Sequence, residues 1–97
     1  MISTKQRAKL KALSMNTPDL VQIGKDGLTE NVLESIKQVL SARELIKIKV
    51  LNNCDSMPKD IASSLENKLH CEIVLVVGSK VVIYKKSDRQ DIKHIEI

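Results

Sequence analysis

The strongest constraint on the fold is a change of hydrophobic period between residues 32 and 50. Apolar residues first recur at helical spacing and make one stripe: Val32, Leu33, Ile36, Val39 and Leu40. From residue 46 the apolar residues instead alternate with Lys47 and Lys49, as in a strand with one solvent-facing side. The pattern predicts a helix that ends near Ala42 and leads at once into a half-buried strand.

The N-terminal segment predicts a further helix and a short strand. Thr4 is a suitable N-cap for a helix that runs to about Ser14. The Asn-Thr-Pro sequence at 16–18 ends this helix, because the residue before a proline avoids helical geometry. Leu20 to Ile23 then predicts a short strand. After a glycine-containing loop, Thr29 is a good N-cap for the helix that carries the apolar stripe.

The C-terminal half predicts a helix followed by a hairpin. Pro58 suits the first turn of a helix whose apolar stripe continues to Leu69. The nearly continuous apolar run at 71–77 predicts a strand that is buried on both sides or largely so. Gly78 and Ser79 make a tight turn into a strand at 80–84. The mostly polar residues at about 86–97 are expected to add a frayed strand or to form a loose tail.

These elements predict one α/β domain over residues 1–97, with the order α-β-α-β-α-β-β. Strands that are separated by helices require crossover connections, which are nearly always right-handed. A two-layer domain, with helices packed on a mixed four-stranded sheet, satisfies this order. Its core must be aliphatic, because the chain has no Trp and no Phe, and Tyr84 is its one aromatic residue.

Positive charge is concentrated at the N-terminus. The first 17 residues carry four basic side chains and no acid, which equals the net charge of +4 for the whole chain. This asymmetry predicts a basic patch for an anionic partner, although a helix face that only keeps the protein soluble gives the same pattern. The four basic residues are Lys5, Arg7, Lys9 and Lys11.

The two cysteines, Cys54 and Cys71, are far apart and do not form a CxxC pair. This spacing does not resemble a secreted disulfide scaffold and favours a reducing compartment. No apolar stretch approaches the roughly 20 residues of a membrane span, and the basic N-terminus lacks the apolar segment of a secretory signal. We therefore expect a cytoplasmic protein with no membrane association.

The loop at 24–27, Gly-Lys-Asp-Gly, is the most informative candidate site. Two glycines between a strand and a helix allow a sharp turn and leave room for a ligand to approach the backbone. The helix that follows Thr29 directs free N–H groups and its positive dipole end towards the loop, which favours an anion, and Lys25 adds a cation. In KH domains a GxxG loop clamps nucleic-acid backbone in this way. Alone the motif is weak, because Gly24 and Gly27 also suit an ordinary turn and Asp26 repels phosphate.

The sequence offers little support for an enzyme. No CxxC, HxxxH or Asp-rich loop gives the spacing of metal ligands, and no motif indicates a cofactor. His70 and Cys71 are adjacent, so on a strand their side chains point to opposite faces and cannot form a nucleophile–base pair. The glycine loop lacks the GK[ST] ending of a P-loop, which argues against an enzyme that acts on a nucleotide. Tyr84 could stack on a base, but a buried core tyrosine is the favoured interpretation.

Four segments of the chain together resemble the CRM domain, named for chloroplast RNA splicing and ribosome maturation, in its stand-alone bacterial YhbY form. They are residues 5–13 (KQRAKLKAL), 21–29 (VQIGKDGLT), 44–50 (ELIKIKV) and 76–85 (VVGSKVVIYK). The resemblance spans nearly the whole chain in order and spacing. It implies an RNA-binding fold similar to the C-terminal domain of translation initiation factor three. It also implies association with ribosomal precursors, as in bacterial members, while plant relatives act on intron RNA.

The resemblance assigns an RNA-binding role to the glycine loop and to the basic first helix. Ser79 departs from the family pattern, in which a lysine commonly follows the glycine of the hairpin turn, and Lys80 can replace that charge. The expected RNA-binding residues are Lys5, Arg7, Lys9, Lys11, Gly24, Lys25, Asp26, Gly27, Thr29 and Lys80. With a single aromatic ring, binding should depend on backbone charge and RNA shape.

We therefore expect a monomeric, non-enzymatic protein that binds structured ribosomal RNA of large-subunit precursors and needs no cofactor, metal or small-molecule substrate. A protein-interaction module that docks through an exposed sheet face or a C-terminal strand remains the alternative. Salt dependence separates the two, because phosphate contacts release counterions and an apolar docking face does not.

Overall fold

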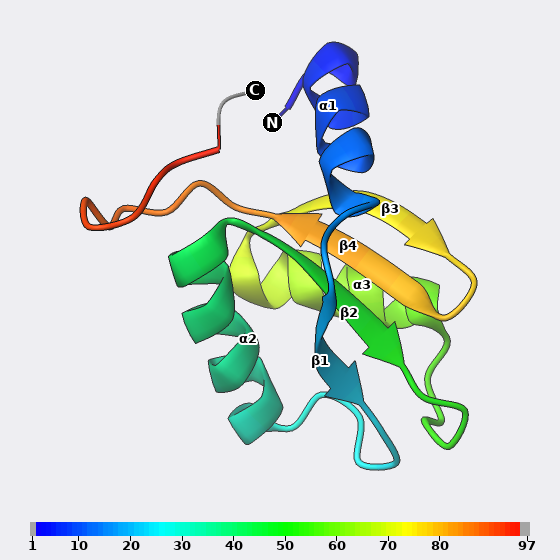
Figure 1. The fold of residues 1–97 in the computed structure, drawn as a ribbon. Coiled ribbons are helices and arrows are strands. Elements are labelled where there is room, and N and C mark those ends of the chain that lie inside the picture. Colours follow the sequence, from blue (N-terminus) through cyan, green and yellow to red (C-terminus); the bar gives the residue numbers. More distant parts are fainter. Residues whose placement is uncertain (1, 96–97) are drawn as a thin grey trace.

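The computed structural model describes residues 2–95, which form three helices and four strands in the predicted order (Figure 1). The α/β fold class is therefore confirmed. The elements are α1 (Thr4–Ser14), β1 (Asp19–Ile23), α2 (Glu30–Arg43), β2 (Leu45–Val50), α3 (Pro58–Leu69), β3 (Glu72–Val77) and β4 (Lys80–Tyr84).

The helices begin at residues that suit the first turn. Ser3, and not the predicted Thr4, is the N-cap of α1, because the side chains of Ser3 and Gln6 bond each other's backbone N–H groups in a capping box. The residues predicted to begin α2 and α3 are confirmed. Thr29 caps α2, and Pro58 occupies the first turn of α3, where its missing N–H group costs nothing.

The four strands form one sheet in the order β1-β2-β4-β3. Strands β1 and β2 are parallel, whereas β4 pairs antiparallel with both β2 and β3, so the sheet is mixed as predicted. The hairpin turn leads from β3 into β4, and β4 lies between β2 and β3 in the sheet. The last strand of the sequence is therefore central in the sheet, and β1 and β3 are its edges.

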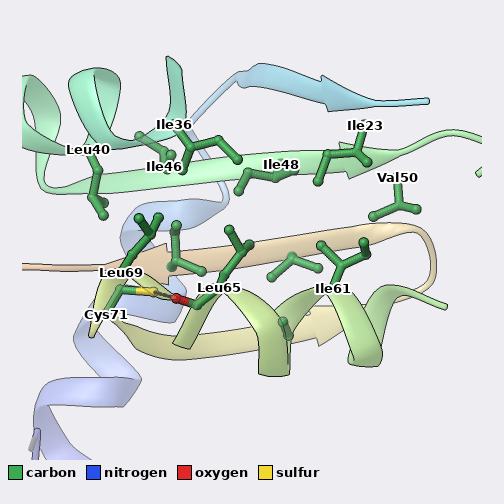
Figure 2. Close-up of a cluster of buried hydrophobic side chains, with 13 residues drawn as sticks. Ile23, Ile36, Leu40, Ile46, Ile48, Val50, Ile61, Leu65, Leu69 and Cys71 are labelled. Atoms are coloured by element: carbon green, nitrogen blue, oxygen red, sulfur yellow. Dashed lines mark hydrogen bonds between the residues drawn. The ribbon is translucent and has the colours of Figure 1, made fainter. Parts of the chain in front are cut away.

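The main core lies between the sheet and the helices α2 and α3, which cover the same face (Figures 1 and 2). Ile36 and Leu40 of α2 pack with Ile46 and Ile48 of β2, the residues that the change of period singles out. The stripe of α3 completes the core, and Leu65, like Ile36, is fully buried. The alternation of β2 thus reflects a strand with one face under helices.

Helix α1 packs against the other face of the sheet and covers only one end of it. Leu10 is fully buried there in a second cluster with Leu45, Val74, Val82 and Tyr84. This packing explains why Leu45 interrupts the polar side of the β2 alternation, because that position lies beneath α1. The sheet and the two helices α2 and α3 form the predicted two layers, and α1 adds a partial layer on the opposite face.

The prediction that the apolar strand at 71–77 is buried on both sides was wrong. The strand β3 is an edge strand, and its last residues Val76 and Val77 are 38% and 58% exposed. The buried strands are β2 and β4, since each has a neighbour on both sides. A run of valines cannot by itself distinguish an edge position from a central one, because both faces of an edge strand can be partly covered.

The tail at 85–95 forms no strand, yet it is attached to the domain by one buried carboxylate. Glu44, the C-cap of α2, is fully buried and accepts hydrogen bonds from the backbone N–H groups of Ser87 and Ile95, at 2.7 Å each. His94 Nδ1 lies 2.7 Å from the same carboxylate. The tail is therefore a docked segment as far as Ile95, and the last two residues lie outside the described part of the chain.

Candidate nucleic-acid interface

The glycine loop is a tight turn between β1 and α2. The N–H group of Gly27 donates to the carbonyl oxygen of Gly24 at 3.0 Å, which places Lys25 and Asp26 at the exposed tip. Gly27 has φ +66°, a conformation that a residue with a Cβ adopts only with strain. Gly27 is thus required by the turn itself, whatever the loop binds.

Gly24 differs, because nothing in the backbone of the protein requires a glycine there. Its φ is not in the left-handed region, and an added Cβ would meet the side chains of Asn53 and Leu51 at 3.6 Å, which is ordinary van der Waals contact. A glycine without an internal structural reason is compatible with close approach of a ligand to the backbone. This difference makes Gly24 the more informative of the two glycines.

The N-terminus of α2 has a mixed electrostatic character. The Thr29 hydroxyl accepts from the N–H group of Val32 at 3.2 Å, and the N–H groups of Glu30 and Asn31 have no acceptor inside the helix. The positive dipole end favours an anion at this position. However, the carboxylates of Asp26 and Glu30 outnumber Lys25, so the loop offers backbone N–H groups without a net positive charge.

The basic residues of α1 have different environments. Lys5, Lys9 and Lys11 are exposed, and Lys5 and Lys9 share the helix face that points away from the sheet. Arg7 is partly buried instead, and its guanidinium donates a hydrogen bond to the carbonyl oxygen of Ile73 in β3. Three lysines of α1 are therefore available for an external anion, while Arg7 also anchors the helix to the sheet.

The structure places α1 and the glycine loop at opposite ends of the molecule (Figure 1). The five residues of β1 lie between them in the chain and span about 17 Å at a rise of roughly 3.3 Å per residue. The two halves of the predicted site are thus not brought together. Any ligand that contacts both must extend along the sheet.

The face of the sheet that α1 leaves open carries three lysines between these two ends. Lys47 and Lys49 lie on the side of β2 that faces away from α2 and α3, and Lys49 pairs directly with Lys80 of β4. Like charges directly opposite each other on a sheet are destabilising unless an anion lies nearby. The sequence shows Lys47 and Lys49, but only the strand order reveals that Lys80 is their neighbour.

The acidic residue Asp19 reduces the positive charge of this surface. The carboxylate of Asp19, at the start of β1, lies 3.2 Å from the Lys80 ammonium, and the Lys80 side chain remains 45% exposed. The Asp19 side chain is only partly exposed, at 24%, so the ion pair lies at the boundary between the sheet and solvent. We use the name lysine face for the lysines of α1 and of the open side of the sheet: Lys5, Lys9, Lys11, Lys47, Lys49 and Lys80.

Tyr84, the candidate for base stacking, lies in the core. Tyr84 is only 6% exposed, and burial, with a smaller contribution from the charge of Glu44, raises its pKa. Its ring packs in the second cluster and is not available for stacking on a base. Within residues 2–95, no group of three or more His, Cys, Asp or Glu side chains is placed to hold a metal ion. No helix in this range is long and apolar enough to cross a membrane.

Comparison with known proteins finds similar chains over nearly the full length of this domain. A Bacillus subtilis protein named "Probable RNA-binding protein YqeI" is 34% identical over 97 residues, which cover all of this chain and 99% of that protein. A Haemophilus influenzae protein named "RNA-binding protein" is 33% identical over 92 residues, or 95% of this chain and 93% of its own. The solution structure of a Staphylococcus aureus protein is similar with a TM-score of 0.78, 38% identity and coverage of 98% and 100%.

The profile of one protein family matches nearly the full domain. The match runs over residues 2–85 and so includes α1, the glycine loop, the whole sheet and the hairpin. The docked tail lies beyond it. By this match and by its full-length relatives, the chain belongs to the CRS1 / YhbY (CRM) domain family.

Proposed function

We propose that this protein binds structured RNA along the lysine face and that the glycine loop holds one phosphate at the far end of the same path. The observation that carries the proposal is the row of sheet lysines, Lys47, Lys49 and Lys80, between α1 and the loop. They join two otherwise separate candidate sites into one surface. The names of the relatives support RNA as the partner.

The chemistry of this surface suits recognition by charge and shape. Lysine ammonium groups bind phosphates as point charges and read no base edge. The one aromatic side chain is buried, so stacking of unpaired bases on an exposed ring is not part of the mechanism. The protein should therefore prefer a folded RNA whose phosphates match the path from α1 to the loop.

The finer proposal is that the RNA is ribosomal and belongs to a large-subunit precursor in the cytoplasm, with the protein acting as a monomer and without catalysis. This part rests on the family resemblance and not on the geometry. The competing idea of a protein-docking module is less favoured, because the open sheet face carries three lysines beside the exposed Val77 and is therefore not a continuous apolar surface. The tail at 85–95 also offers no strand for such docking.

Salt titration of binding to structured ribosomal RNA, with duplex DNA as competitor, tests the proposal. The variant Lys47→Gln/Lys49→Gln should weaken binding and reduce the slope of log K against log[salt] by about one for each phosphate that the variant no longer neutralises. The matched control, Lys59→Gln/Lys93→Gln, removes the same charge from exposed positions outside the lysine face. Equal slopes for both double variants would refute the sheet path.

A second pair of variants isolates the glycine loop. Gly24→Ala should leave stability nearly unchanged, because its Cβ makes only ordinary contacts, yet it should weaken RNA binding. Gly27→Ala should cost about 1 kcal/mol in stability, because of its positive φ. If Gly24→Ala binds RNA as the parent does, the loop is a structural turn only.

Cosedimentation with large-subunit precursors tests the ribosomal part of the proposal separately. Absence of cosedimentation alongside normal RNA binding would refute only that part.

A further inference from the structure

A second candidate site lies on the side of the molecule that α2 and α3 cover. The ends of these two helices and the tail at 85–89 bound a cleft of about 450 Å³. This volume falls in the range of roughly 300–1,000 Å³ that small-molecule sites occupy. The sheet separates the cleft from the lysine face, so this site is independent of the surface proposed above.

The lining of the cleft combines an apolar base with a strongly cationic rim. Leu40 and Leu69 contribute side chains that are almost fully buried. Four lysines surround them, whereas Asp88 is the one carboxylate among the lining residues. The lysines are Lys37, Lys68, Lys85 and Lys86. A ligand that matches this lining has a compact, weakly polar part and more than one negative charge.

Internal interactions compensate part of this positive charge. Arg89 also lines the cleft, but its guanidinium makes two hydrogen bonds to Asp91, at 2.9 and 2.6 Å. The Lys85 ammonium donates to the carbonyl oxygen of Leu69 at 3.0 Å, where it offsets the negative dipole end of α3. The carbonyl groups at the C-terminal ends of α2 and α3 thus offset part of the positive charge of the cleft. A smaller hollow adjoins the cleft and shares Lys37, Lys68 and Leu69 with it. The carboxylates of Glu30 and Glu34 line this hollow and reduce the net positive charge near the two helix lysines.

The tail wall of the cleft is fixed before any ligand binds. The backbone N–H groups of Lys85 and Ser87 donate to Glu44, to its carbonyl oxygen at 2.9 Å and its carboxylate at 2.7 Å. Glu44 is fully buried, and a buried carboxylate with several donors holds its partners firmly. A preformed wall reduces the ordering cost of binding, which is the property expected of a binding site.

We propose that this cleft binds a phosphorylated nucleoside. Its base and sugar would lie over the floor of the cleft, and its phosphate groups would be bound by Lys37 and Lys68 from the helices and by Lys86 from the tail. The ligand chemistry has two sources, a free nucleotide or an unpaired nucleotide of a bound RNA. The tail thus forms part of a site and is not a simple extension of the domain.

The test is a titration of the isotopically labelled protein, followed by the backbone amide resonances in NMR spectra. The probes are adenosine monophosphate, adenosine diphosphate, the pentanucleotide r(A)5 and inorganic phosphate. The expected result is a saturable shift of the amides of Leu69, Lys85 and Ser87 with the adenosine probes. Tighter binding of r(A)5 than of the mononucleotides assigns the site to RNA, and the reverse order assigns it to a free nucleotide. Shifts that inorganic phosphate reproduces in full, or no shifts there at millimolar concentrations, would overturn the proposal.

Variants locate the binding within the molecule. Lys37→Gln/Lys68→Gln should weaken adenosine diphosphate binding roughly tenfold, as expected when charged hydrogen bonds are removed. The double variant Lys59→Gln/Lys93→Gln serves again as the charge-matched control and should bind normally. Lys47→Gln/Lys49→Gln, which alters the lysine face, should also bind the mononucleotide normally, so failure of this site and failure of the RNA surface are distinguishable. Unaltered affinity of Lys37→Gln/Lys68→Gln would refute the assignment to the cleft.

Discussion

The substitution Glu44→Gln tests how much of the domain depends on one buried carboxylate. Glu44 links three parts of the structure, because it ends α2, precedes β2 and holds the tail. It does so with φ +66° and ψ −36°, a strained conformation for a residue other than glycine. Glutamine has nearly the same shape, so the substitution removes the charge without creating a cavity.

The expected cost follows from the hydrogen bonds. The carboxylate accepts from Ser87 and Ile95, and hydrogen bonds to charged groups contribute about 1.5–3 kcal/mol each. Glutamine retains one acceptor oxygen and must point its NH₂ group at the other N–H donor. The contact with His94 adds less, because that side chain is 38% exposed. We expect a loss of about 2–4 kcal/mol in the free energy of unfolding, or roughly 10–25 °C in Tm for a domain of this size.

The pH dependence provides an independent check. Burial acts to raise the pKa of Glu44, but hydrogen bonds from His94, Ser87 and Ile95 outweigh it, and the pKa is lowered from its ordinary value of 4.5. A carboxyl group with a depressed folded-state pKa stabilises the protein above its unfolded-state pKa, and this contribution is lost as pH falls through the folded-state pKa. The difference between parent and Glu44→Gln should therefore be full at pH 7 and shrink below about pH 4 to 5.

Urea unfolding followed by circular dichroism at both pH values measures this difference. Hydrogen exchange of the Ser87 and Ile95 amides reports whether the tail alone detaches. The control is Glu34→Gln, an exposed glutamate of the same helix, which should change stability by less than about 0.5 kcal/mol. If Glu44→Gln is as stable as this control at pH 7, or if the difference persists unchanged at low pH, the reasoning is refuted.

Two further predictions concern the two cores. Leu10→Ala should destabilise the protein by about 2–5 kcal/mol in urea unfolding, because Leu10 is fully buried and holds α1 on the sheet; a change as small as that of an exposed residue would contradict the second cluster. In the main core, burial raises the pKa of the Cys71 thiol to about 11, whereas Cys54 is only partly buried. At pH 8 an alkylating reagent should therefore modify Cys54 first, as judged by peptide mass spectrometry, and equal rates would contradict the burial of Cys71.

Local signals determined the helices, the strands and the glycine turn. The change of period at 32–50 depends only on which residues lie three, four or two positions apart, and so it identifies α2 and β2 without knowledge of the rest of the fold. Thr29 and Pro58 favour the start of a helix through the geometry of the first helical turn. Gly27 adopts the positive φ that its own turn requires. For the same reason the N-cap of α1 was misplaced by one residue, since Ser3 and Thr4 are both good caps and only the geometry decides between them.

Tertiary structure decided every feature that links distant residues. The strand order puts β4 in the centre and β3 at the edge, which made the valine run more exposed than predicted and placed Lys80 beside Lys49. Arg7 contacts a carbonyl 66 positions away, and Glu44 holds the tail from 43 to 51 positions away. The sequence therefore determined which elements form and where charge is concentrated along the chain. Only the packing of the sheet determined which charges share a face, because non-local neighbours depend on topology and leave no periodic signal.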